Sequence, residues 1–297
     1  MCVSSGPAIL ARGIGKSFRQ RLVLNSIELH VERGELIGLI GKNGAGKSTL
    51  LRILTGLIPR DRGEVSVLGM DPSVAAKRIR ERTGYLPGET SVYQQMTGQQ
   101  FLDFALSFYP RRQTALLDDL LDIFALPLQQ RVRNYSAGMK QKLALIASLS
   151  PDLDLYLLDE PDRALDASIR FQLRDVLLRM RNDGRTFVLS SHHLSEVETL
   201  ADRLEFLLDG SLVAPQVIAK ARARLQRLVR IKLTQNAILP TNCTVLTKEA
   251  DGTMILEPVD APLDWLKLLP PSSVCTAEIG IARLEDLYKL LLAEVLA

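Results

Sequence analysis

The chain has 297 residues, which suits one α/β domain of about 210–220 residues with a small appendage. Its 46% hydrophobic and 24% charged residues are typical of a packed globular protein, and a net charge of +3 is too small to indicate a polyanion-binding protein. Three scattered cysteines lack metal or disulfide spacing, which predicts a reduced, intracellular protein, and no apolar run approaches the length of a membrane span.

Residues 1–7 are expected to form a flexible N-terminus. Residues 8–40 then contain three strand-like segments, of which the last, Glu35–Ile40, is almost wholly apolar. A continuous apolar run of that length suits a strand buried on both faces of a sheet. A glycine-rich loop follows it, and the leucine spacing over Ser48–Leu57 predicts a helix.

The glycine-rich loop, residues 41–48, reads GKNGAGKS and satisfies the phosphate-loop pattern GxxxxGK[ST] between a strand and a helix. Glycines let consecutive backbone N–H groups curl around phosphate oxygens, and the following helix adds its N-terminal dipole. Lys47 is expected to contact the β- and γ-phosphates, and Ser48 to contact Mg²⁺. The expected ATP-binding residues here are Gly41, Lys42, Asn43, Gly44, Ala45, Gly46, Lys47, Ser48 and Thr49.

Residues 95–130 change to helical character. Thr97 and Gln100 form a capping-box pattern before a helix over Phe101–Tyr109, and a leucine stripe predicts a second helix that ends before Pro127. The segment Tyr135–Lys140 then opens a third helix with Ser136 as its N-cap. By itself that segment is either a plain capped helix or a second exposed anion site.

A second acidic element follows the apolar strand Leu153–Leu158. Asp159 and Glu160 would lie at the carboxyl edge of a parallel sheet, where nucleotides bind in such folds. Asp159 would hold Mg²⁺, and Glu160 would polarise the water that attacks the γ-phosphate. Further strands at Phe187–Ser190 and Leu204–Leu208 alternate with helices, which predicts a mostly parallel sheet.

The composition shifts after Asp209-Gly210. A basic linking helix is expected first, then short strands and a final helix from about Arg283. The basic residues from Lys220 to Lys232 are either the solvated face of that linking helix or a contact with anionic lipid.

Over residues 8–215 the chain resembles the ATP-binding cassette ATPases. The resemblance rests on the order of the phosphate loop, the Ser-Ala-Gly-Met-Lys variant of the signature, Asp159-Glu160-Pro161, Ala164-Leu165-Asp166 and His192. It implies a phosphate-loop NTPase core, with a mostly parallel sheet flanked by helices and a β subdomain. A helical insert at about 90–150 and a small α+β C-terminal extension, 216–297, complete the expected domains.

The resemblance also implies roles for single residues. Phe18 would stack on adenine, and His192 would contact the γ-phosphate. Asp166 would lie in the loop that joins two such domains. The signature residues would contact ATP bound to a second subunit, and they are Ser136, Ala137, Gly138 and Met139.

The implied function is ATP hydrolysis that powers export through a separate integral membrane permease. ATP with Mg²⁺ would be buried between two ATP-binding subunits, which are expected to be two identical copies. The permease would dock on residues 95–133. The chain would be cytoplasmic and peripheral on the inner face of the membrane, with no nucleic acid as partner. The alternative is a soluble ATPase of the same type that acts as an ATP-gated clamp on ribosomes or nucleic acid.

The sequence departs from the family pattern at three places. Gly88, followed by Glu89, stands where a glutamine is usual: either Glu89 replaces that glutamine as a Mg²⁺ ligand, or coupling to the helical insert runs through the backbone alone. The signature has Ala137 for a usual glycine and Met139 for the usual glutamine. Arg163 lies in a loop, residues 162–164, where small polar residues are normal.

Overall fold

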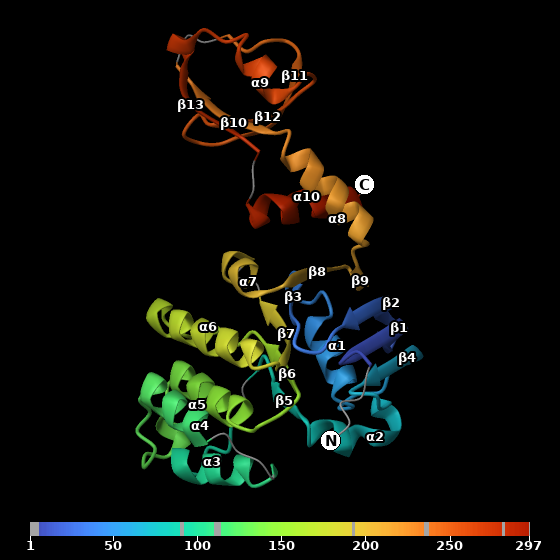
Figure 1. The fold of residues 1–297 in the computed structure, drawn as a ribbon, viewed down its shortest axis with the longest axis vertical. Helices are drawn as coiled ribbons and strands as arrows, with labels where there is room; N and C mark the ends of the chain where they lie inside the picture. The colour runs from blue at the N-terminus through green and yellow to red at the C-terminus, as the bar shows by residue number, and fades with distance from the viewer. Residues whose placement is uncertain are drawn as a thin grey trace. The chain divides into compact units, whose positions relative to one another are not determined.

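The computed structural model describes residues 6–89, 92–109, 114–191, 194–234, 238–280 and 283–296. The chain forms two compact units, residues 1–212 and 213–297 (Figure 1). None of the helices in the described ranges is both long and apolar enough to span a bilayer.

The first unit contains two sheets. An antiparallel sheet has the order β2-β1-β4, and a six-stranded sheet has the order β5-β6-β7-β3-β8-β9, parallel except for β9. The strands are β1 (Ile9–Phe18), β2 (Arg21–Val31), β3 (Leu36–Ile40), β4 (Arg62–Val67), β5 (Thr83–Leu86), β6 (Leu155–Asp159), β7 (Thr186–Ser191), β8 (Arg203–Leu208) and β9 (Ser211–Leu212).

Seven α-helices accompany these sheets, with α3, α4 and α5 grouped together as the helical insert (Figure 1). The capping box predicted at Thr97 and Gln100 is confirmed at the start of α3. The helices are α1 (Lys47–Leu54), α2 (Pro72–Arg80), α3 (Gly98–Leu106), α4 (Thr114–Phe124), α5 (Ala137–Leu149), α6 (Ala167–Asn182) and α7 (Leu194–Leu200), with a 3₁₀ turn at Val132–Asn134.

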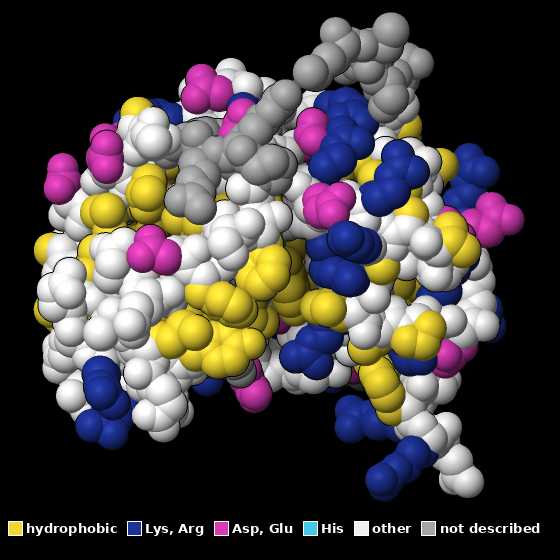
Figure 2. All heavy atoms as spheres, turned by 90° about the horizontal axis from the view of Figure 1, so that it is seen from below, with side chains coloured by type: hydrophobic (Ala, Val, Ile, Leu, Met, Phe, Trp, Pro, Cys, Tyr) yellow, Lys and Arg dark blue, Asp and Glu magenta, His cyan; other side chains and the backbone are white. Residues whose placement is uncertain are grey.

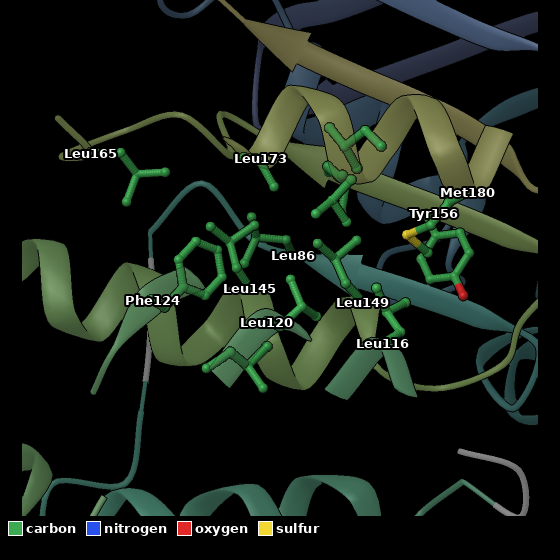
Figure 3. Packing of buried hydrophobic residues seen from close by; sticks show 14 of the residues in the cluster. Leu86, Leu116, Leu120, Phe124, Leu145, Leu149, Tyr156, Leu165, Leu173 and Met180 are labelled. Carbon is green, nitrogen blue, oxygen red and sulfur yellow. The ribbon is translucent and has the colours of Figure 1, made fainter. Parts of the chain in front are cut away.

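The predicted parallel sheet is confirmed, and both of its faces are covered. In β6, Leu155 and Leu157 belong to the core that contains α1 and the antiparallel sheet. Tyr156 and Leu158 belong to the core that contains α4, α5 and α6, part of which is drawn in Figure 3. Because alternate residues of a strand point to opposite faces, both cores fix the position of Asp159 at the strand's end.

The second unit is a four-stranded antiparallel sheet of order β11-β12-β10-β13 with helices. The buried ring of Trp265 lies in its core with Val229, Ile231 and Leu256. Its elements are α8 (Pro215–Leu225), β10 (Val229–Leu233), β11 (Cys243–Lys248), β12 (Met254–Pro258), α9 (Pro262–Leu266), a 3₁₀ turn (Pro271–Ser273), β13 (Val274–Ile279) and α10 (Leu284–Leu296).

Candidate functional site

A cavity of about 780 Å³ in the first unit gathers residues from four separate stretches of sequence. The hairpin of β1 and β2, the glycine loop with α1, the segment after β5, and the end of β6 with the loop after it all contribute to it. Its lining residues are Phe18, Arg21, Val23, Asn43, Gly44, Gly46, Lys47, Ser48, Thr49, Arg52, Gly88, Glu89, Asp159, Glu160 and Arg163.

The glycine loop connects buried β3 to α1. Gly46 is the N-cap of α1 with a φ of 109°, and no side chain caps this helix start. A Cβ on Gly46 would lie 2.7 Å from Leu24 Cδ2 and 3.0 Å from the Val23 carbonyl oxygen, so only glycine fits this left-handed position. The first N–H groups of α1 are therefore free of side-chain caps and suited to bind phosphate oxygens.

Lys47 is 5% exposed and is held by the loop itself. Its Nζ donates to the carbonyl oxygens of Gly41 at 2.6 Å and Lys42 at 3.3 Å. Burial lowers the pKa of Lys47, whereas the charges of Glu160 and Asp159 raise it. A phosphate group would act in the same direction as the two carboxylates and favour the charged ammonium.

Asp159 ends β6 and is 1% exposed. Its Oδ1 accepts a hydrogen bond from Ser190 Oγ on β7, while Oδ2 has no hydrogen-bond partner among the described residues. A buried carboxylate oxygen without a partner is costly, so this atom is suited to a cation. The space beside it is kept open by Gly88, on which a Cβ would lie 2.9 Å from Asp159 Oδ2.

Asp159 and Ser48 therefore fit a Mg²⁺ site. Among the described residues, no group of three or more His, Cys, Asp or Glu side chains could hold a metal ion. That is compatible with Mg²⁺, which is usually held by one or two carboxylates, water and the phosphates of a substrate.

Glu160 follows Asp159 in a left-handed conformation, with a φ of 49°. Its backbone N–H donates to the Ser190 carbonyl oxygen at 3.0 Å. Gln141, buried on α5, donates Nε2 to the carbonyl oxygens of Glu160 at 3.3 Å and Pro161 at 3.2 Å. Sequence reasoning missed Gln141; its only signal was a polar residue among the apolar positions of that helix.

Phe18 lies at the end of β1 and is 47% exposed, so its ring is accessible from the cavity that it lines. Lys16 Nζ lies 5.3 Å from the centroid of this ring. Three of the nine expected loop residues, Gly41, Lys42 and Ala45, do not line the cavity. Lys42 Nζ instead forms an ion pair with Asp209 Oδ1 at 2.7 Å.

The signature segment lies at the start of α5 and does not line the cavity of its own chain. Ser136 Oγ caps the helix by accepting from Met139 N at 3.2 Å, and Ala137 is the first helical residue. A Cβ on Gly138 would lie 2.7 Å from the Ala164 carbonyl oxygen, so glycine is needed here for packing against the loop after β6.

Two further expected residues remain. Asp166 is the N-cap of α6 and accepts from Ile169 N at 3.0 Å. Hydrogen bonds from Ser168 and from Ile169 N lower the pKa of Asp166. His192 lies outside the described residues.

The sequence pattern that defines the ABC transporter family matches residues 24–163. An uncharacterised ABC transporter ATP-binding protein of Nostoc is 36% identical over 64% of this chain, and the match spans only 58% of that relative's length. The Nod factor export ATP-binding protein I of Bradyrhizobium diazoefficiens is 35% identical over 71% of this chain and 70% of its own. A solved ATP-binding subunit of an ABC transporter is 28% identical, with a TM-score of 0.66 over 72% of this chain and 92% of that one.

Proposed function

This chain belongs to the ATP-binding proteins of ABC transporters, and on that premise we propose that it hydrolyses ATP to power export through a separate membrane-spanning subunit. The observation that supports this proposal most is that a single cavity brings the phosphate loop with Lys47 together with Asp159 and Glu160. The clamp on ribosomes or nucleic acid has no support among the three relatives named above, all of which are ATP-binding proteins of transport or export systems by name.

Each side of the cavity has a distinct task in this proposal. The uncapped start of α1 and Lys47 bind the β- and γ-phosphates, and Phe18 stacks on the adenine. Ser48 and Asp159 hold Mg²⁺, which when bound supplies positive charge to the phosphates. Glu160 accepts a proton from the attacking water, because its carboxylate lies next to the phosphate site on a loop that is fixed by Ser190 and Gln141.

The signature segment acts on a second subunit. Since Ser136–Met139 do not line the cavity of their own chain, they serve ATP only if another copy presents its phosphate loop to them. Asp166 would lie in the loop that joins the two subunits head to tail, and His192 would contact the γ-phosphate. Two identical copies are the proposed pair.

The membrane subunit docks on a groove of about 490 Å³ between α2, β5, α3 and α5. Tyr93, Phe104 and Phe108 are 57%, 38% and 62% exposed there, and their rings contact one another edge to face, with centroids 5.3 Å and 5.1 Å apart. On the face shown in Figure 2, hydrophobic side chains gather beside lysine and arginine side chains. Exposed aromatic clusters of this kind are typical of protein interfaces.

Two measurements test the proposal. The purified chain should release phosphate from ATP, and removing Mg²⁺ with a chelator should abolish that release. In cells the chain should fractionate with the membrane and co-purify with an integral membrane protein. A chain that stays in the soluble fraction and binds ribosomes instead would contradict the transport function while leaving ATP hydrolysis intact.

A further inference from the structure

Two of the places where the sequence departs from its family lie in contact. Arg163, in the loop after β6, donates Nη1 to the carbonyl oxygen of Gly88, after β5, at 2.7 Å. The two residues are 75 positions apart in sequence, and both line the phosphate cavity. A departure at one position is therefore answered by a departure at the other.

Gly88 has no space for the side chain that is usual at its position. A Cβ there would lie 2.9 Å from Asp159 Oδ2 and 3.1 Å from Asp159 Cγ, against the buried carboxylate proposed to hold Mg²⁺. Gly88 therefore brings no side chain against Asp159. What Gly88 still offers to a partner is its carbonyl oxygen, and Arg163 uses it.

Arg163 is fixed to the same turn as Glu160. Its backbone N–H donates to the Glu160 carbonyl oxygen at 3.1 Å, and the Glu160 N–H donates to Ser190 O on β7. Glu160 and Ala164, on either side of Arg163, are both left-handed, with φ of 49° and 58°. The guanidinium of Arg163 therefore belongs to the same constrained turn as Glu160.

We infer that Arg163 is a positioning residue that replaces the missing side chain of residue 88: it joins the loop carrying Asp159 and Glu160 to the segment that leads into α3. This inference rests on the proposed ATP site and adds to it the route by which phosphate binding reaches the helical insert. A guanidinium suits the task because it offers five donors in a fixed plane, so it can hold the Gly88 carbonyl and still face the cavity.

Hydrogen exchange of the full chain tests this inference, with Mg²⁺ and a non-hydrolysable ATP analogue added. A peptide over residues 43–54 reports nucleotide binding, and one over residues 92–106 reports the response of α3. We expect both peptides to gain protection in the wild type. In Arg163→Ala the first response stays, whereas the second falls by at least half, and Arg163→Lys, which keeps a cationic donor, retains more of the second response than alanine does.

Arg78→Ala is the matched control, because Arg78 is exposed on α2 and its side chain makes no hydrogen bond or ion pair among the described residues. It should leave both responses unchanged. Equal protection of residues 92–106 in wild type and Arg163→Ala, with residues 43–54 still responding, overturns the inference alone. If residues 43–54 do not respond in the wild type, ATP binding itself is refuted and the inference falls with it.

Discussion

Two helices of the first unit begin with different chemistry, although both suit an anion. The start of α1 has no side-chain cap, and a buried lysine, Lys47, points back into its loop. The start of α5 is capped by its own Ser136, and Gly138 packs closely against the loop after β6. The first would bind phosphate within one chain, whereas the second lies outside the cavity that the first one lines.

This difference indicates which of the two helix starts can bind ATP without a second subunit. Uncapped N–H groups and a nearby cation are enough to bind phosphates in a single chain. A helix start already satisfied by its own serine adds little affinity until a ligand is pressed against it by a second subunit. We therefore expect variants at α1 to change ATP binding, and variants at α5 to change only what requires two chains.

The largest effect is expected from Glu160→Gln, which leaves both helix starts intact. The amide keeps the shape of the side chain but cannot accept the proton of the attacking water, so the rate of hydrolysis should fall by about 10²–10⁴. ATP binding, measured by calorimetry, should survive, and the two-chain form should accumulate with ATP. Turnover within twofold of the wild type would show that Glu160 is not the base.

Lys47→Ala breaks the α1 half. Removing a charged donor from the phosphates should weaken ATP binding about 10- to 100-fold, since such hydrogen bonds contribute about 1.5–3 kcal/mol. Hydrolysis should fall together with binding, because the charge acts on the ground state and the transition state alike. Calorimetry on the isolated chain is the measurement, and wild-type affinity would contradict the assignment of Lys47.

Ser136→Ala breaks the α5 half. We expect ATP affinity of the single chain to stay within twofold, while ATP-driven dimerisation and hydrolysis fall about tenfold through loss of one hydrogen bond. The matched control is Thr97→Ala, which removes the N-cap of α3 and costs a similar ~1 kcal/mol of stability. If Thr97→Ala impairs dimerisation equally, as seen by light scattering, lost helix stability would explain both variants.

Phe18→Ala tests the same ATP site as Lys47→Ala, but it separates binding of the adenine base from binding of the phosphates. Stacking of a base on an aromatic ring contributes about 1–3 kcal/mol, and the half-exposed ring of Phe18 should lie at the lower end, about fivefold in ATP affinity. Inorganic triphosphate, which has no base, should bind Phe18→Ala and the wild type equally well. A parallel loss for triphosphate would show that Phe18 supports the loop instead.

The sequence predicted the strong elements of the first unit and missed the weak ones. The strand before the phosphate loop, the signature helix and the strand before Asp159 carry long apolar patterns, and all are present. β4 and α2 were missed. β4, Arg62–Val67, has only two buried residues, Val65 and Val67, and α2 is recognisable mainly by its Asp71 cap and Pro72. A short helix or strand that is stabilised by neighbouring elements has too few residues to show a clear hydrophobic periodicity.

Contacts between residues that are far apart in the sequence could not be predicted for a different reason. The basic cluster after residue 220 left two interpretations open, and the structure favours the solvated helix and sheet face. Arg224 pairs with Glu257, Arg230 with Glu249 and Lys232 with Asp251. These carboxylates are 19 to 33 residues away, and strand pairing brings them close. The contact of Arg163 with Gly88 was hidden in the same way, since nothing local in either segment indicates the other.

Glu89→Ala should give the smallest effect. It tests whether a further carboxylate, beside that of Asp159, takes part at the proposed Mg²⁺ site. Glu89 lines the cavity, but the residue is exposed. A third carboxylate beside Asp159 and Glu160 would be repelled unless Mg²⁺ were already bound.

Since Glu89 is exposed and the Gly88 carbonyl next to it is held by Arg163, we expect Glu89 to take no part in basal chemistry. Basal ATP hydrolysis of the purified variant should stay within twofold of the wild type. Stimulation by the membrane subunit should fall instead, because Glu89 is exposed in the segment after β5, which also supplies Leu86 and Pro87 to the aromatic groove. A large loss of basal hydrolysis with intact ATP binding would show that Glu89 has taken over the role of the missing glutamine, and the task assigned to Arg163 would then be shared.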